Sequence, residues 1–165
     1  MKKKIETVAI IPARSGSKGI KNKNIQKIRN KPLLAWAIDA CKKSKKIDYF
    51  FVLTDSSVYK KIAIKYGSNV PFKRPKSISK DSSTDIEFVK YSIKKLAELK
   101  IYPKIILNIR PTTPFRDYKI IDKAITIFKK NYKKYSSLRS VEEMSETSFK
   151  TLIIENKVAK PAMKK

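Results

Sequence analysis

The chain has 165 residues, 41% of them hydrophobic, which is enough for one globular domain with a buried core. Its formal net charge is +26, but only six of its 40 basic residues are arginines, and the lysines are spread over nearly every segment. Nucleic-acid-binding proteins concentrate Arg and Lys on one face, so we expect no specific nucleic-acid partner. The single cysteine, Cys41, excludes an internal disulfide, and the absence of histidine excludes Cys/His metal sites and histidine-based catalysis.

Apolar runs and helical patterns alternate along the chain. This alternation, with short connections, predicts a mostly parallel, doubly wound sheet covered by helices on both faces, that is, a Rossmann-like three-layer α/β/α sandwich. The predicted strands are 7–11, 49–53, 104–109 and 136–141, with a possible short strand at 68–72, and the predicted helices are 33–43, 58–66, 86–99 and 118–130. Cys41 falls in an apolar helical pattern, so we expect it in the core.

Local signals mark the ends of these helices. Pro32 stands at the first turn of the first helix, and Gly67 stops the second. The sequence Thr54-Asp55-Ser56 is a natural N-cap, so we interpret Asp55 as a helix cap rather than a metal ligand. Thr84 or Asp85 caps the third helix.

Three polar loops, at 14–24, 54–56 and 110–116, follow predicted strands. Ligands of parallel α/β sheets bind outside the carboxyl ends of the strands, so these loops predict a binding site. The first loop holds two of the chain's three glycines and has no P-loop or G-x-G-x-x-G spacing. Its cations favour phosphate binding, although a basic surface turn remains an alternative. They are Arg14, Lys18 and Lys23.

Five blocks of sequence form a recognisable set. They are I-P-A-R-S-G-S-K-G at 11–19 with Lys23-Asn24, L-T-D-S at 53–56 with Tyr66-Gly67, Arg74-Pro75 with Asp81, P-T-T-P-F-R at 111–116, and S-E-T-S-F-K at 145–150. In this order they resemble the motifs of the acylneuraminate cytidylyltransferases, which make CMP-sialic acid and related CMP-activated nine-carbon acidic sugars. The resemblance spans almost the whole chain and implies the nucleotide-diphospho-sugar transferase fold, with one cytidylyltransferase-like domain over residues 1–165.

The reaction that this resemblance implies is attack of the sugar's anomeric hydroxyl on the α-phosphorus of CTP, with release of pyrophosphate. Lys23 and Arg14 are the implied catalytic residues. The implied nucleotide-binding residues are Arg14, Ser17, Lys18, Lys23, Asn24, Arg74, Asp81 and Ser83, and the implied sugar-binding residues are Arg110, Thr112, Arg116 and Lys150. Arg74 is expected near the cytosine, or else it only anchors its own loop.

Arg110 stands where sialic-acid enzymes usually carry glutamine. An arginine there either grips the sugar carboxylate or extends an electropositive rim. The resemblance also implies an Mg²⁺ cofactor, held in the family by an Asp-x-Asp pair. Because that pair and the family's C-terminal arm have no match up to Lys165, we expect a C-terminally shortened member with a weakened homodimer.

No apolar run reaches the length of a membrane span, so we expect a cytoplasmic protein without membrane contact. The resemblance implies that it serves cell-surface polysaccharide synthesis. The alternatives within the enzyme class are cytidylyl transfer to another acidic sugar, such as 3-deoxy-manno-octulosonate, and nucleotidyl transfer to a sugar phosphate. Outside that class, the chain is an inactive CTP-binding protein or, driven by net charge, a nucleic-acid binder.

Overall fold

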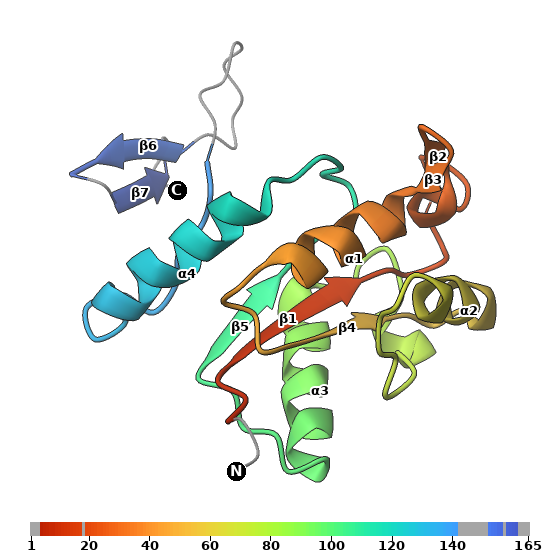
Figure 1. The fold of residues 1–165 in the computed structure, drawn as a ribbon, viewed down its shortest axis with the longest axis horizontal. Helices are drawn as coiled ribbons and strands as arrows, with labels where there is room; N and C mark the ends of the chain where they lie inside the picture. The colour runs from red at the N-terminus through yellow and green to blue at the C-terminus, as the bar shows by residue number, and fades with distance from the viewer. Residues whose placement is uncertain (1–3, 18, 142–151, 157, 162–165) are drawn as a thin grey trace. The chain divides into compact units, whose positions relative to one another are not determined.

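A computed structural model of the chain describes residues 4–17, 19–141, 152–156 and 158–161 (Figure 1). The chain divides into two compact units, Met1–Asn131 and Tyr132–Lys165. The first unit holds a parallel sheet and all four α-helices that the described residues form. Its sheet strands are β1 (Thr7–Pro12), β4 (Tyr49–Leu53) and β5 (Ile105–Asn108), and its helices are α1 (Leu33–Lys43), α2 (Ser57–Lys65), α3 (Asp85–Glu98) and α4 (Tyr118–Asn131).

The sheet has the strand order β4-β1-β5, with both neighbours parallel to β1. The central strand is almost completely buried, which explains why its sequence is an unbroken apolar run. In the register of the sheet, Ile10 lies between Phe51 of β4 and Asn108 of β5. The carboxyl ends of all three strands therefore meet at one edge of the sheet.

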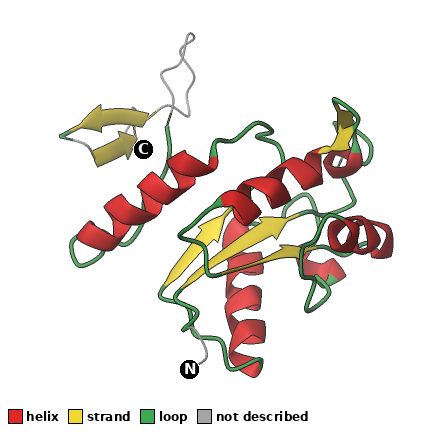
Figure 2. Ribbon diagram, viewed as in Figure 1, coloured by secondary structure: helices red, strands yellow, loops and turns green. Residues whose placement is uncertain are grey.

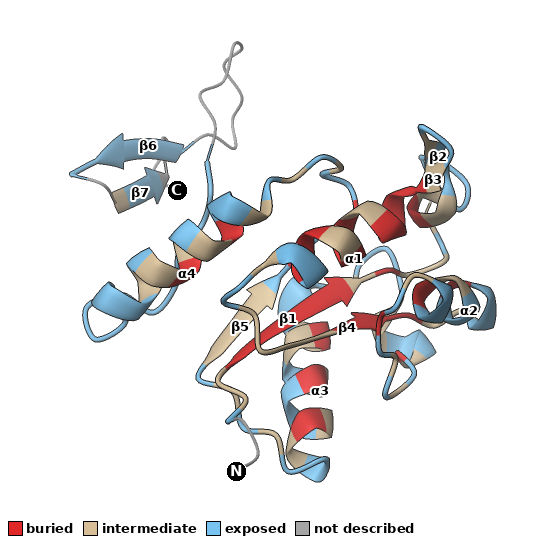
Figure 3. Ribbon diagram, in the orientation of Figure 1, coloured by how far each residue is buried: buried red, intermediate tan, exposed pale blue. Residues whose placement is uncertain are grey.

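Helices cover both faces of this sheet, as Figures 1 and 2 show. Val8 and Ile10 of β1 pack with α3 on one face, through Phe88 and Leu96. The alternate residues of β1 pack on the other face with side chains of α1, α2 and α4. Buried residues line the sheet and the helix sides that face it in Figure 3. The predicted three-layer α/β/α sandwich is confirmed.

The helix ends follow the local signals. The Ser56 hydroxyl accepts a hydrogen bond from the Tyr59 amide at 3.3 Å and caps α2. Gly67, with φ of 83°, ends that helix in the left-handed region. Thr84 directly precedes α3 and forms a capping box with Glu87. Pro32 directly precedes α1.

The core contains Cys41, which is 2% exposed, as expected from its helical pattern. Burial raises the pKa of this thiol to about 12. The group therefore stays protonated at neutral pH and belongs to the packing of α1 rather than to any chemistry.

Two predicted strands are absent from the described structure. Residues 68–72 make only a single parallel bridge, between Asn69 and Phe51, because Pro71 cannot donate to a ladder. Residues 136–141 are irregular and exposed, so the strand predicted there is wrong. Leu138 and Val141 are three positions apart, so they cannot share one face of a strand.

The remaining elements are short. In the first unit they are two 3₁₀ turns, η1 (Lys23–Ile25) and η2 (Lys76–Ile78), and an antiparallel pair, β2 (Lys27–Ile28) with β3 (Lys31–Pro32). In the second unit, β6 (Leu152–Glu155) and β7 (Val158–Pro161) form an antiparallel hairpin. Within the described parts of the chain, no helix is both long enough and apolar enough to span a membrane.

Candidate active site

A cleft of about 400 Å³ opens at the carboxyl edge of the sheet, within the size range of small-molecule sites. It is lined by the loop after β1, the segment from residue 74 to the first turn of α3, and the loop after β5. Nine of the residues singled out from the sequence line it, namely Arg14, Ser17, Lys23, Asn24, Arg74, Asp81, Ser83, Arg110 and Thr112. Lys18 and Lys150 lie outside the described residues.

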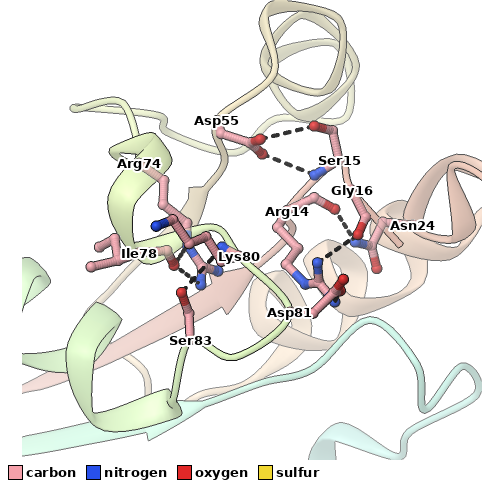
Figure 4. A network of polar contacts seen from close by, with 10 residues as sticks. All are labelled: Arg14, Ser15, Gly16, Asn24, Asp55, Arg74, Ile78, Lys80, Asp81 and Ser83. Carbon is pink, nitrogen blue, oxygen red and sulfur yellow. Dashed lines mark hydrogen bonds and ion pairs between the residues drawn. The ribbon is translucent and has the colours of Figure 1, made fainter. Parts of the chain in front are cut away.

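The loop after β1 is tied down by two contacts (Figure 4). The Asp55 carboxylate accepts hydrogen bonds from the Ser15 amide at 2.9 Å and from the Ser15 hydroxyl at 2.8 Å. Asn24, which is buried, donates from its Nδ2 to the Arg14 carbonyl at 3.0 Å. The interpretation of Asp55 as a helix cap is therefore wrong, because Ser56 caps α2 and Asp55 fastens the loop to the end of β4.

Arg14 connects this loop to the segment at 76–83. Its Nη1 donates to the Gly16 carbonyl at 2.5 Å, and its Nη2 lies 2.6 Å from Asp81 Oδ1. These contacts engage two of the five N–H donors of the guanidinium and leave three for a ligand. Arg14 thus stands in the cleft with its direction already set.

Arg74 is 4% exposed and serves the loop in which it lies. Its Nε and Nη2 donate to the Ile78 carbonyl at 3.0 and 2.5 Å, and its Cζ lies 5.1 Å from the centre of the Phe88 ring. Burial lowers the pKa of the guanidinium from its ordinary value. In this structure Arg74 anchors its own loop, and the Ser83 hydroxyl, which accepts from the Lys80 amide at 3.1 Å, closes the end of that loop.

Arg110 is held by a residue that the sequence did not single out for the site. Its Nη2 forms an ion pair with Asp85 Oδ2, and the same oxygen accepts a hydrogen bond from Asn108 Nδ2 at 3.0 Å. Asp85 was expected only as a helix cap. Its position as the first residue of α3 could have identified it as a site residue, because the segment that leads into this helix runs along the carboxyl edge of the sheet.

The charge of the cleft is positive. Among its described lining residues, four cations face the two carboxylates of Asp81 and Asp85. The cations are Arg14, Lys23, Arg74 and Arg110. Lys23 is half-exposed and makes no ion pair within the described part of the chain. The arrangement attracts a polyanion and leaves Lys23 available to bind it.

The carboxylates near the cleft do not offer a magnesium site. Asp55 binds Ser15, Asp81 pairs with Arg14, and Asp85 pairs with Arg110. No group of three or more acidic or cysteine side chains that could hold a metal ion occurs among the described residues. The described residues therefore do not fit an Mg²⁺ ion held by protein ligands alone.

Arg116 lies apart from the other predicted residues. It lines a second cleft of about 290 Å³ together with Trp36 of α1 and Tyr118 at the start of α4. Burial lowers the pKa of its guanidinium. The structure thus does not bring Arg116 together with Arg110 and Thr112.

Comparisons with known proteins agree with this architecture. The cytidylyltransferase family model matches residues 8–160. The N-acylneuraminate cytidylyltransferase of Escherichia coli O18:K1:H7 is 36% identical over 141 residues, which are 86% of this chain and 32% of the relative. The CMP-N,N'-diacetyllegionaminic acid synthase of Legionella pneumophila is 34% identical over 122 residues, which are 74% of this chain and 53% of the relative.

A solved structure of a CMP:2-keto-3-deoxy-manno-octonic acid synthetase complexed with CTP superposes with a TM-score of 0.65 at 16% identity, covering 76% of this chain and 48% of that one. This likeness shows the fold. The chain spans about a third of the length of the first of these curated relatives and about half of the second. From the family match over most of its length, the chain belongs to the cytidylyltransferase family.

Proposed function

We propose that the cleft binds CTP and transfers its cytidylyl group to an acidic nine-carbon sugar, giving a CMP-sugar and pyrophosphate. The observation that carries the proposal is the convergence of nine residues, selected from the sequence alone, on one positively charged cleft. The names of two relatives, an N-acylneuraminate cytidylyltransferase and a CMP-N,N'-diacetyllegionaminic acid synthase, support the sugar class. Likeness to the octonic acid synthetase is confined to the fold, so that sugar is the less supported alternative.

The loop after β1 would take the triphosphate. Lys23 supplies a cation with no competing ion pair among the described residues, and Arg14 supplies its three remaining N–H donors. The oxygen of the anomeric hydroxyl forms a bond to the α-phosphorus as the bond to the bridging oxygen breaks. The hydroxyl proton passes to water, and pyrophosphate leaves with the bridging oxygen. Catalysis of this step consists mostly of positioning and of neutralising charge on the phosphates.

The segment at 76–83 would face the cytosine. In this proposal Arg74 does not contact the base directly but fixes the Ile78 carbonyl, which sets the shape of the loop. Asp81 and Ser83 then present polar groups along the cleft wall. On the wall after β5, Arg110 and Thr112 would take the acidic sugar.

Mg²⁺ is a proposed cofactor that would enter with the triphosphate. Magnesium is commonly held by substrate phosphates and only one or two carboxylates, and it neutralises phosphate charge when bound. We assign no described carboxylate to it, because Asp55, Asp81 and Asp85 all have protein partners. The same observation favours a second candidate, a CTP-binding protein without turnover. As an enzyme, the protein would act in the cytoplasm and supply the CMP-sugar for cell-surface polysaccharide synthesis.

The test is calorimetry of the 165-residue chain with CTP, ATP and GTP, followed by a pyrophosphate-release assay with Mg²⁺. The assay would use N-acetylneuraminic acid, N,N'-diacetyllegionaminic acid and 2-keto-3-deoxy-manno-octonic acid. We expect CTP to bind more tightly than either purine nucleotide, and pyrophosphate release to depend on a nine-carbon acid. CTP binding without release would favour the second candidate. Equal binding of all three nucleotides would contradict a cytidylyltransferase site.

A further inference from the structure

The first turn of α3 contacts two arginines of the cleft. Asp85, its first residue, pairs with Arg110, and Phe88, three positions later, lies under the guanidinium of Arg74. The capping box of Thr84 fixes the start of this turn, so both contacts come from a rigid element. A single helical turn thus orients arginines that belong to two different loops.

The Asp85 carboxylate contacts Asn108 as well as Arg110. Its Oδ2 accepts from Arg110 Nη2 and from Asn108 Nδ2, and the latter distance is 3.0 Å. Asn108 is the last residue of β5, which makes it part of the sheet frame. Asp85 also lies at the amino end of a helix, where the helix dipole stabilises a negative charge. A strand and a helix together therefore fix the carboxylate to which Arg110 is bound.

Stability does not explain this arrangement. The side chains of Arg110 and Asp85 are 57% and 49% exposed, and ion pairs at such exposure contribute little to folding. What the pair does is remove rotational freedom from Arg110. The ion pair engages one of the five N–H donors of the guanidinium. The other four lie in the plane of that group at the cleft wall, where they are available to a ligand. A guanidinium with one corner fixed in this way is prepared for bidentate binding of a planar carboxylate.

We propose that Asp85 is a positioning residue that orients Arg110 toward the carboxylate of the second substrate. This inference rests on the proposed function, because it takes an acidic sugar as that substrate. Asp85 does not touch the sugar. The planar guanidinium of Arg110 matches the geometry of a carboxylate, so once it is oriented by Asp85 it selects that group by two directed hydrogen bonds.

The experiment measures recognition of the carboxylate separately from binding of the nucleotide. The 165-residue chain, in EDTA to prevent turnover, is titrated with CTP and, once saturated, with N-acetylneuraminic acid or its methyl ester, which lacks the charged group. The variants are Asp85→Ala, Arg110→Ala and the double variant. Glu98→Gln, which removes one acid from the other end of α3, is the matched control.

We expect the wild type to bind the acid at least tenfold more tightly than the ester, since a charged hydrogen bond that is lost weakens binding by about 10- to 100-fold. In Asp85→Ala the preference for the acid over the ester should fall to within about threefold, with CTP affinity unchanged. The double variant should lose no more of this preference than Arg110→Ala alone. Asp85→Glu should restore part of the preference, and Glu98→Gln should keep all of it.

Each other result overturns the inference. An acid preference that survives in Asp85→Ala shows that Arg110 needs no positioning, and tighter acid binding shows that Asp85 restrains Arg110 instead. Parallel losses for CTP, acid and ester show a structural role only. Absence of acid binding alongside normal CTP binding removes Arg110 from the sugar site but leaves nucleotide binding intact. Absence of CTP binding both in EDTA and with Mg²⁺ present overturns the proposed function itself.

Discussion

Replacing Asp55 by alanine tests whether the loop after β1 is held ready for the nucleotide. The change removes the two hydrogen bonds from Ser15, at 2.9 and 2.8 Å, and leaves a shortened side chain at a half-buried position. Hydrogen bonds to charged groups contribute about 1.5–3 kcal/mol each, and two bonds to one carboxylate are not fully additive. We therefore expect the free energy of unfolding in urea to fall by about 2–4 kcal/mol.

The same change should weaken nucleotide binding. A loop that is no longer fastened to β4 must be ordered when CTP binds, and that cost reduces the affinity. If ordering the loop takes about 2 kcal/mol from the binding free energy, the dissociation constant for CTP rises roughly 30-fold. Calorimetry at a temperature where both proteins are folded measures this value directly.

Asp55→Asn is the matched control. The amide oxygen of the substituted side chain can still accept from the Ser15 amide, and its NH₂ group can donate to the Ser15 hydroxyl, so both contacts are kept without the charge. We expect CTP affinity within about threefold of wild type, with or without Mg²⁺. If this variant lost Mg²⁺-dependent binding as severely as Asp55→Ala, Asp55 would be a metal ligand and the fastening role would be refuted.

Three further predictions concern other parts of the chain. Lys23→Ala should weaken CTP binding by about 1–3 kcal/mol in calorimetry, because a charged hydrogen bond to phosphate is lost, and an unchanged affinity would remove Lys23 from the site. Cys41 should react slowly with a thiol reagent at pH 8, because burial raises its pKa to about 12, and quickly in urea; rapid labelling of the native protein would contradict its place in the core. Binding to duplex DNA should be weak, independent of sequence and lost at physiological salt, so a defined footprint at that salt would contradict the interpretation of the lysines as dispersed charge.

The sequence by itself determined the layers and the location of the site. The apolar runs at β1, β4 and β5 and the periodic patterns between them were sufficient for the parallel sandwich, because burial on both faces makes such strands continuously apolar. The loops that follow those strands contained most of the cleft, since the carboxyl ends of parallel strands share one edge. The strand wrongly predicted at 136–141 shows that a short apolar pattern does not suffice to predict a strand when no neighbouring strand pairs with it.

Only the tertiary structure decided which partner each polar side chain takes. The pairs of Asp55 with Ser15, Arg14 with Asp81 and Arg110 with Asp85 join residues that are 25 to 67 positions apart. Residue type and local spacing cannot encode such pairings, because they depend on how the strands and helices are placed in space. For the same reason, Arg116 carries a family motif and yet lies at a second cleft, where packing against α1 rather than sequence proximity to Arg110 sets its position.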